Sequence, residues 1–393
     1  MPSHIMTMWI PRAIEPALLH LANSRPVLIL TGARQTGKTS TLRRLFPNLD
    51  FVSLDLPSEA EQAEKEPTQF LQRHPPPVIL DEVQYAPSLF RHLKVVVDAH
   101  RDKTGQFLIT GSQKFTLMKG VGESLAGRAA IVELEPLAFS EARAALPQTR
   151  LLDFIVRGGM PELHATSELD VVSFQNSYLA TYLQRDVRTL ANVGSLRDFE
   201  RFLRACALRS ANLLNKADLA RDVGIAPSTA NQWISILEAS GQVTLLEPWF
   251  SNRTKSIVKS PKLYMNDTGL LCALLNIRDM DALIRSPSAG AVWETFVLAQ
   301  LRHRERVAGR QGSLFFWRDR TREVDFVVEE AGKLDLLEAK WTELPDAADL
   351  VNLRFVREAL GRRKVRTAGV ICRAAHGFPL EDALRAVSVE ELD

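Results

Sequence analysis

An eight-residue stretch near the N-terminus has the residue types and the spacing of a loop that binds phosphate. It matches the pattern G-x-x-x-x-G-K-[ST], and it stands directly between an apolar run and a helical pattern. In such a loop backbone N–H groups surround the phosphate oxygens, the lysine reaches the outer phosphates, and the final hydroxyl ligates Mg²⁺. We therefore expect ATP and Mg²⁺ as cofactors, held by Gly32, Ala33, Arg34, Gln35, Thr36, Gly37, Lys38 and Thr39.

Two carboxylates follow a second apolar run, 78–80. In this position Asp81 would hold Mg²⁺ through water, and Glu82 would polarise the water that attacks the outer phosphate. A kinase that phosphorylates a small molecule has no need of the second acid. The pair therefore favours hydrolysis of ATP.

Three further residues would complete a hydrolytic site. The run 107–109 ends in small polar residues, so Thr110 or Ser112 is expected to sense the terminal phosphate. Arg128 precedes the next run and would act as an arginine finger on the nucleotide of a neighbouring subunit, which requires a homo-oligomer. The alternative is that Arg128 is an ordinary loop arginine.

At these positions the sequence resembles the AAA+ superfamily of P-loop ATPases. The resemblance rests on residues 32–39, on Asp81-Glu82, on Ile109-Thr110-Gly111-Ser112, and on Ala126-Gly127-Arg128 followed by Glu135-Pro136-Leu137. With the stretch KLYMNDTGLL at 262–271 included, the chain resembles more narrowly the prokaryotic, archaeal-type ATPases whose C-terminal half is a domain of unknown function. The resemblance implies that ATP is bound and hydrolysed.

The C-terminal part has charged residues where a strand is expected. At the apolar run 334–339, strand alternation puts Glu338 and Lys340 on one face of a sheet. Asp325 lies in an expected strand upstream, and Glu294 lies in an amphipathic helix. Three carboxylates brought together favour a divalent cation, and Mg²⁺ or Mn²⁺ prefers oxygen ligands.

This set of Glu, Asp and Glu-x-Lys resembles the restriction-endonuclease-like core, often written PD-(D/E)xK. It predicts metal ligation by Glu294, Asp325 and Glu338, with Lys340 positioning the water that attacks a phosphodiester. Either of two basic groups could then face a nucleic-acid backbone: Arg318, Arg320 and Arg322, or Arg362, Arg363, Lys364 and Arg366. In the alternative, Glu294 and Asp325 are surface acids, Glu338 pairs structurally with Lys340, and the fold is a binding scaffold.

Between these two parts, residues 213–250 and the segment after them resemble a winged helix-turn-helix. A helix that begins with Ser228 as its N-cap would present Thr229, Asn231, Gln232 and Ser235 to the major groove of DNA. Phosphate contacts would come from Arg253, Lys255 and Lys259. The expected recognition helix carries Glu238 and no Lys or Arg, so a packing module is the alternative.

The expected elements define an α/β fold. Short apolar runs at 27–30, 51–54, 78–80, 107–109 and 131–134 alternate with helical patterns, which is typical of a parallel sheet with helices on both faces. A helical and winged-helix segment and an α/β endonuclease-like domain follow. The expected domains are 1–150 (ATPase), 151–210 (helical lid or connector), 211–260 (winged helix) and 261–393 (endonuclease-like).

The composition limits the class of protein. The chain has 393 residues, enough for two or three domains, and its formal net charge of +2 gives no global attraction to nucleic acid or membrane. Cys206, Cys272 and Cys372 are too widely spaced for a zinc site, and no apolar run is long enough to span a membrane. We expect a cytoplasmic ATPase that couples ATP hydrolysis to binding, remodelling or cleaving DNA. The alternative is an ATP-dependent switch of defence or toxin–antitoxin type, whose C-terminal domain binds a partner without nuclease activity.

Overall fold

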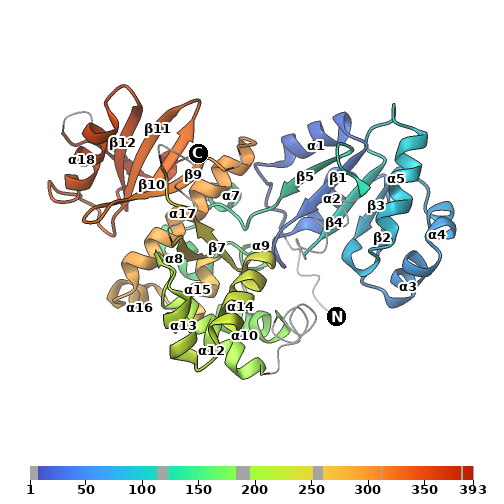
Figure 1. Cartoon of the computed structure of the whole chain (residues 1–393), viewed down its shortest axis with the longest axis horizontal. Coiled ribbons are helices and arrows are strands. Elements are labelled where there is room, and N and C mark those ends of the chain that lie inside the picture. Colours follow the sequence, from blue (N-terminus) through green and yellow to red (C-terminus); the bar gives the residue numbers. More distant parts are fainter. Residues whose placement is uncertain are drawn as a thin grey trace. The chain divides into compact units, whose positions relative to one another are not determined.

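The computed structural model describes residues 8–112, 122, 124–182, 195–250, 260–310, 312–381 and 384–392. They form two compact units, shown in Figure 1. The N-terminal unit comprises Met1–Leu137, Met160–Ala165 and Ala239–Gly241, and the C-terminal unit comprises the rest. The α/β class predicted from the sequence is confirmed. The four-domain division stays a prediction.

The N-terminal unit is built on a parallel five-stranded sheet. The strands lie in the order β2-β3-β4-β1-β5, so β4 separates the strand before the phosphate loop from the strand that ends in carboxylates. Each predicted strand is present within two residues of its expected bounds: β1 (Val27–Thr31), β2 (Asp50–Ser53), β3 (Val78–Asp81), β4 (Phe107–Gly111) and β5 (Ala129–Glu133). Because the strands are parallel, their carboxyl ends meet at one edge of the sheet.

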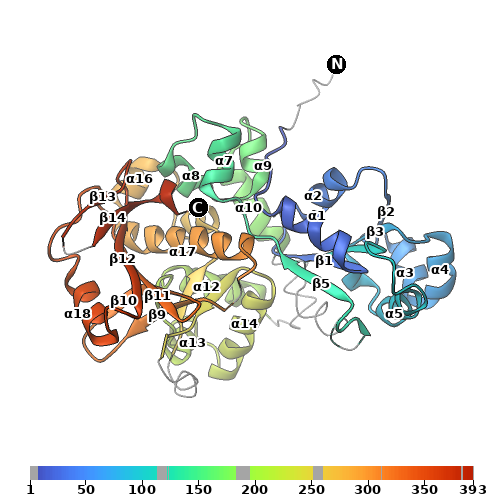
Figure 2. The ribbon, with the colours of Figure 1, turned by 90° about the horizontal axis from the view of Figure 1, so that it is seen from above.

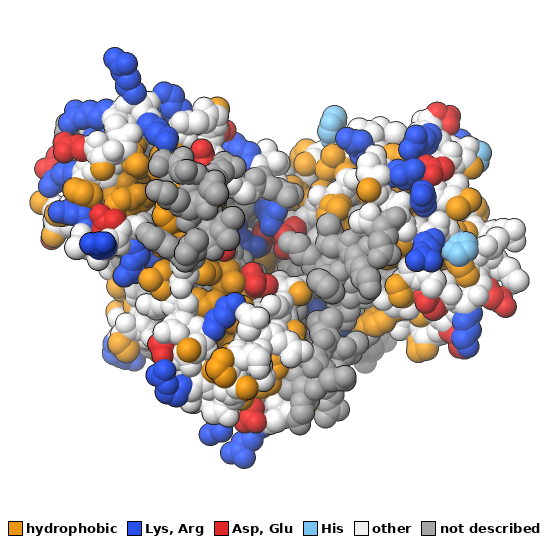
Figure 3. All heavy atoms as spheres, viewed as in Figure 1, with side chains coloured by type: hydrophobic (Ala, Val, Ile, Leu, Met, Phe, Trp, Pro, Cys, Tyr) orange, Lys and Arg blue, Asp and Glu red, His pale blue; other side chains and the backbone are white. Residues whose placement is uncertain are grey.

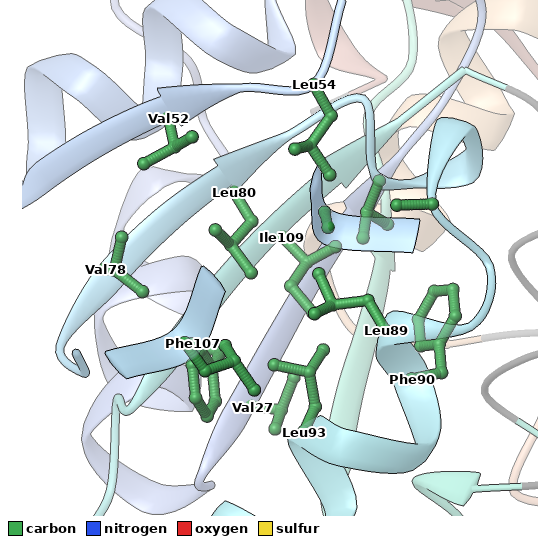
Figure 4. Close-up of a cluster of buried hydrophobic side chains, with 14 of the residues drawn as sticks. Val27, Val52, Leu54, Val78, Leu80, Leu89, Phe90, Leu93, Phe107 and Ile109 are labelled. Carbon is green, nitrogen blue, oxygen red and sulfur yellow. The ribbon is translucent and has the colours of Figure 1, made fainter. Parts of the chain in front are cut away.

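Apolar side chains from every second strand residue form the core on one face of this sheet. Val27, Ile29, Leu80 and Ile109 are at most 1% exposed and pack against apolar residues of the helices that cover the face (Figure 4). The helices of the unit are α1 (Glu15–Ser24), α2 (Lys38–Leu45), α3 (Pro57–Lys65), α4 (Pro67–Arg73), α5 (Leu89–Ala99) and α9 (Pro161–Ala165), with a short 3₁₀ turn at Val83–Tyr85. Replacing one buried leucine of this core by alanine would lower the free energy of unfolding by about 2–5 kcal/mol.

The C-terminal unit begins with helices and a small antiparallel sheet. The helices are α7 (Phe139–Ala145), α8 (Leu151–Arg157), α10 (Val171–Tyr182), α12 (Leu196–Ala207), α13 (Lys216–Val223), α14 (Pro227–Ala239), α15 (Thr268–Leu274) and α16 (Met280–Arg285). The sheet has the order β6-β8-β7, from β6 (Asn212–Leu213), β7 (Val243–Leu246) and β8 (Lys262–Met265). The predicted helix-turn-helix pair and the strand after it are present as α13, α14 and β7.

One local expectation about this pair is wrong. Ser228 does not cap the recognition helix, because α14 already begins at Pro227, and the Ala230 N–H donates to the Ala226 carbonyl. Proline fits a first helical position, since its missing N–H has no intrahelical acceptor there. Arg253, Lys255 and Lys259 lie outside the described residues.

A six-stranded mixed sheet completes the C-terminal unit. Its order is β13-β14-β12-β11-β10-β9, from β9 (Leu314–Arg318), β10 (Glu323–Glu330), β11 (Lys333–Ala339), β12 (Val365–Cys372), β13 (Phe378–Pro379) and β14 (Arg385–Ser388). The long helix α17 (Ala289–Val307) crosses this sheet in Figure 2, and the indole N–H of Trp293 donates to the Ile371 carbonyl. Helix α18 (Val351–Leu360) packs Leu353 and Val356 against Val324 and Leu336. A 3₁₀ turn at Val389–Glu391 follows β14.

No helix in the described ranges combines the length and the apolar character that crossing a membrane requires.

Candidate functional site

The predicted phosphate loop joins β1 to α2, and two of its glycines are required by geometry. Gly32 has a φ of 145°, and a Cβ there would lie 2.4 Å from the Leu134 carbonyl oxygen. Gly37 has a φ of 89° and immediately precedes α2, without a side-chain cap. The first N–H groups of α2 therefore keep their capacity to bind an anion.

Lys38, the loop lysine, is 5% exposed and folds back on the loop. Its Nζ donates to the Gly32 carbonyl at 3.1 Å and to the Ala33 carbonyl at 2.7 Å. An ammonium held here lies at the N-terminus of α2, beside the N–H groups that would meet phosphate. Lys38 thus lies against the phosphate loop, hydrogen-bonded to two of its backbone carbonyl oxygens.

At the carboxyl end of β3, the carboxylate of Asp81 contacts hydroxyl groups from three other elements, α2, β4 and β2. Its Oδ1 accepts from Thr39 Oγ1 and from Thr110 Oγ1, each at 2.6 Å, and Ser53 Oγ lies 3.4 Å from Oδ2. Carboxylate and hydroxyl oxygens are the ligand types that Mg²⁺ prefers. The residues present at the loop therefore fit Mg²⁺, with Thr39 and Asp81 as its holders.

Glu82 follows in a left-handed backbone conformation with a φ of 56°, which is uncommon for a residue with a side chain. Its N–H donates to Thr110 Oγ1 at 3.1 Å, and its carboxylate accepts from Ser112 Oγ at 3.1 Å and from Gln84 Nε2. The side chain is thereby held beside Asp81 and the loop. The structure brings Thr110 and Ser112 to the two acids, where Thr110 joins Asp81 to the Glu82 backbone.

Arg12 is a site residue that the sequence gave no reason to select. It is 4% exposed, and its guanidinium donates to the Thr36 carbonyl at 2.9 Å and to the Glu135 carbonyl at 2.7 Å. One side chain thus ties the phosphate loop to the end of β5. No local pattern marks Arg12, because the carbonyl groups that its guanidinium contacts are distant in sequence.

A cavity of about 440 Å³ adjoins the loop within the N-terminal unit. This volume lies in the range of small-molecule sites. One of its wall residues, Thr41, has a buried hydroxyl with no hydrogen-bond partner in the described part of the chain. The walls include Trp9, Ile10, Arg12, Gln35, Gly37, Thr41, Pro161 and Ala165.

Arg128, the predicted arginine finger, is engaged on its own chain. Its guanidinium donates to both carboxylate oxygens of Asp98, at 2.7 and 2.9 Å, and to the Ala126 carbonyl at 3.0 Å. A bidentate contact of this kind fixes the plane of the guanidinium. The geometry favours a structural role for Arg128 within the subunit.

The C-terminal unit gathers most of its predicted residues, together with a lysine that the sequence did not single out. Lys262 of β8 is 2% exposed, and its Nζ lies 2.8 Å from Glu294 Oε1, 2.5 Å from Glu323 Oε1 and 3.3 Å from Asp325 Oδ1. Tyr264 donates its hydroxyl to Glu294 Oε1 at 2.6 Å. We name Lys262, Tyr264, Glu294, Glu323 and Asp325 the lysine cluster.

Glu338 has partners of its own beside the lysine cluster. Its Oε2 accepts the Asp325 N–H at 3.3 Å, and Asn352 Nδ2 of α18 lies 3.5 Å from its Oε1. Asp325 Oδ2 accepts the Ala339 N–H at 3.0 Å. The register that pairs Phe326 with Leu337 accounts for these contacts across β10 and β11.

Burial and neighbouring charges together shift the pKa of each of these groups. Burial, followed by the charge of Asp325, raises the pKa of Glu338 to about 9 and that of Glu294 to about 7. Burial alone would lower the pKa of Lys262, but the three carboxylates around it raise the pKa instead. Burial alone would raise the pKa of Asp325, but Lys262 and its hydrogen bonds lower it. Lys262 and Asp325 are therefore a charged pair.

The predicted three-carboxylate metal centre is not the arrangement found. In the ranges described above, no group of three His, Cys, Asp or Glu side chains is placed to hold a metal ion. The ammonium of Lys262 already lies within hydrogen-bonding distance of both Glu294 and Asp325. The carboxyl group of Glu338 contacts that of Asp325 and lies 3.5 Å from Asn352 Nδ2. The alternative in which Glu294 and Asp325 are surface acids is also wrong, because Asp325 is 8% exposed and both pair with Lys262.

Several of the predicted basic residues have partners within the unit. Arg366 donates to Asp335 at 3.0 and 2.5 Å, and Arg318 donates to Glu323 at 2.9 Å. Arg322 lies over the ring of Phe355 at 4.3 Å, and Lys364 lies over the ring of Trp249 at 4.6 Å. The remaining members, Arg320, Arg362 and Arg363, are at the surface.

The helix-turn-helix has the predicted buried and exposed faces. Trp233 and Ile234 of α14 are at most 5% exposed, whereas Asn231, Gln232 and Ser235 are exposed and Thr229 is half-buried. Lys216 of α13 donates to Asn231 Oδ1 at 2.5 Å. A polar surface that includes Glu238 thus lies opposite the core face of α14.

Three protein families match successive parts of the chain. Residues 24–143 match an AAA domain, residues 148–281 match a domain of unknown function (DUF8612), and residues 289–392 match a second one (DUF4143). The AAA match covers the phosphate loop, both acids, Thr110 and Ser112. The N-terminal unit is therefore a P-loop domain of the AAA type.

Among solved structures, a Walker-type ATPase of Pyrococcus abyssi aligns with 68% of this chain and 96% of its own, at 15% identity and a TM-score of 0.48. A signal transduction ATPase with numerous domains from Pyrococcus horikoshii aligns with 80% of this chain and 50% of its own, at 13% identity and a TM-score of 0.26.

Two curated relatives extend over nearly the whole chain. They are the uncharacterized protein Rv2008c of Mycobacterium tuberculosis and the uncharacterized protein Mb2031c of Mycobacterium bovis. Each is 33% identical over 394 residues, which covers 99% of this chain and 86% of the relative. The chain therefore belongs to the family of these uncharacterized mycobacterial proteins.

Proposed function

We propose that the protein binds ATP with Mg²⁺ and hydrolyses it. One observation carries this proposal: the two acids at the end of β3 are joined to the phosphate loop, because Asp81 accepts a 2.6 Å hydrogen bond from Thr39. Glu82 stands next to Asp81 with its carboxylate held by Ser112. This is the arrangement that phosphoryl transfer to water needs, since catalysis there depends on positioning and on electrostatics.

Each residue has a distinct task in this proposal. Lys38 exchanges its two carbonyl partners for phosphate oxygens, and the N–H groups at the start of α2 bind the same anion. Thr39 and Asp81 hold Mg²⁺, which supplies charge neutralisation to the phosphates. Glu82 accepts a proton from the attacking water. The adjoining cavity, with Trp9 and Pro161 in its wall, takes the nucleoside.

Two variants distinguish the binding of ATP from its hydrolysis. Lys38→Ala removes a charge-assisted contact, so we expect ATP affinity to fall about 100-fold in an equilibrium binding measurement. Glu82→Gln keeps every contact to the nucleotide, so its affinity should stay within a few-fold of the wild type. Glu61→Gln, the same change on the exposed face of α3, is the control. Unaltered ATP binding by Lys38→Ala would remove the loop from the proposed role.

We further propose that DNA is the partner on which the ATP cycle acts. Support comes from the order of elements α12, β6, α13, α14, β7 and β8, which is the order of a winged helix, and from the polar face of α14. A helix of this kind reads base edges in the major groove, while phosphate contacts supply most of the affinity.

A charge placed on this face tests the DNA proposal. Gln232→Glu puts a carboxylate on the exposed face of α14, where it would repel phosphates. We therefore expect the affinity for duplex DNA to fall at least about 10-fold. Gln69→Glu, the same change at an exposed position of α4, should leave the affinity for duplex DNA unaltered. Equal loss, or no loss, in both variants would contradict the placement of α14. Fluorescence anisotropy at two salt concentrations measures the affinity and its salt dependence.

Cleavage of DNA is a finer hypothesis for the C-terminal unit. Support comes from Asp325 and Glu338, which lie on the adjacent strands β10 and β11, and from Lys340, which directly follows β11. Lys262 favours instead the alternative, in which this sheet binds a partner without cutting, because its ammonium pairs with Glu294 and Asp325. Strand cleavage measured with Mg²⁺ or Mn²⁺ separates the two, since only a nuclease would lose cleavage in Glu338→Ala.

A further inference from the structure

A buried ammonium lies at the centre of the lysine cluster, and its bonding capacity is filled by protein oxygens. An ammonium has three N–H donors, and Nζ of Lys262 lies within 3.3 Å of one oxygen from each of Glu294, Glu323 and Asp325. These carboxylates come from α17 and β10, whereas Lys262 comes from β8. One cation thus joins the small antiparallel sheet to the large mixed sheet.

The backbone of Lys262 is held in the small sheet. Lys262 is paired with Leu213 of β6 on one side and with Leu246 of β7 on the other, and all four residues of β8 are buried. The side chain is 2% exposed, and the ring of Phe316 lies 5.7 Å from Nζ. A lysine is buried to this degree only when its charge is paired.

The ammonium and a divalent cation would compete for the same oxygens. A Mg²⁺ or Mn²⁺ bound to Glu294 and Asp325 would lie within a few ångströms of Nζ, where two positive charges repel strongly in a buried site. Both cations satisfy the same requirement, which is to neutralise carboxylates away from water. The cluster therefore has room for one of them.

We propose that Lys262 is the built-in cation of this cluster: it takes the position that a divalent metal would need, so the C-terminal unit works as a metal-free scaffold. It follows that Lys262 locks β8 to α17 and β10 without a metal. It also follows that the unit does not cleave phosphodiesters.

Mn²⁺ binding to the full chain without nucleotide tests this directly. We expect wild type and Asp325→Asn to bind the same number of Mn²⁺ ions, because the cluster takes none. Lys262→Met should gain one Mn²⁺ per chain and should be stabilised against thermal unfolding by Mn²⁺. The gain should be absent from Lys262→Met/Asp325→Asn and from Lys333→Met, a control at an exposed lysine of β11.

Three results obtained with folded proteins would overturn the proposal. The first is a Mn²⁺ ion in wild type that Asp325→Asn loses, and the second is a folded Lys262→Met that gains none. The third is DNA cleavage by wild type that Glu338→Ala abolishes. If Lys262→Met does not fold in metal-free buffer, Mn²⁺ or the second change Glu294→Gln should restore the fold, because the defect is then unbalanced negative charge. Failure of both to restore it would likewise contradict the proposal.

Discussion

Asp81 and Lys262 each bind side chains from several elements, but only one of them could be found from the sequence. Lys38, Thr39, Asp81 and Glu82 could be predicted because short local patterns mark them. Lys262 could not, because its partner Asp325 lies 63 residues away and no spacing rule connects a strand lysine to it. The hydrogen bonds of Thr110 to both acids were missed for the same reason.

Thr110 acts as a positioning residue in this account. Thr110→Val keeps the shape but removes the hydroxyl that joins Asp81 to the Glu82 N–H, so we expect kcat for ATP to fall about 10-fold. Thr110→Ser should restore most of the rate, because it returns the hydroxyl. Steady-state phosphate release with circular dichroism as a folding check measures this. Normal turnover in Thr110→Val would show that the hydroxyl does not position the acids.

Glu305 makes the stability of the protein depend on pH in acid. Burial opposes its charge, but hydrogen bonds from Arg310 and Ser313 lower its pKa from 4.5 to about 2. A lowered carboxyl pKa stabilises the folded state above about pH 4.5, and this contribution is lost as the pH falls towards 2.

Glu305→Gln should therefore flatten the loss of stability between about pH 5 and pH 3 in urea unfolding. Glu358→Gln, at an exposed position of α18, should follow the wild-type pH dependence. Parallel curves for wild type and Glu305→Gln would contradict this assignment.

The elements of the N-terminal unit could be predicted more completely than their order in the sheet. Buried strands such as β1 and β4 read as continuous apolar runs, which is why all five were found. Apolar runs do not specify neighbours, so the placement of β4 between β1 and β3 required the structure. The short pieces Met160–Ala165 and Ala239–Gly241, which group with this unit, have no signal in the sequence either.

Gly241 shows how one of these pieces bears on the phosphate loop. Its φ is 70°, and a Cβ added there would lie 3.2 Å from Ala33 Cβ and 3.3 Å from Ala33 N. Gly241→Ala should displace the loop and weaken ATP binding several-fold. Gly224→Ala carries similar backbone strain at a φ of 80° but meets nothing within 4 Å, so it should bind ATP normally. Equal ATP affinities in the two variants would contradict a role for this contact.

Across the whole molecule, no excess of charge directs the protein to one kind of partner. In Figure 3 the Lys and Arg side chains are spread over the visible face with Asp and Glu among them, in keeping with a net charge of +2. Affinity for DNA must then come from a local surface, and the salt dependence of binding should be modest. The composition could not identify a partner.

If DNA is the partner, the nucleotide cycle should respond to it. We expect duplex DNA to raise ATP turnover several-fold in the wild type and to leave turnover unchanged in Gln232→Glu, because that variant no longer binds the duplex. Phosphate release with and without DNA measures the response. If single-stranded, duplex and branched DNA all leave ATP turnover unchanged, the alternative is favoured, in which the protein is an ATP-dependent switch with a protein partner.

The central claim is that the N-terminal unit hydrolyses ATP with Glu82 as the acceptor of the proton from water. Steady-state phosphate release at saturating ATP and Mg²⁺, in wild type and in Glu82→Gln, tests it most directly. The account predicts measurable turnover in the wild type and a fall of about 10²–10⁴-fold in Glu82→Gln, with ATP binding retained. Equal turnover in the two proteins would contradict it. So would a wild type that shows no turnover either without DNA or with single-stranded, duplex or branched DNA.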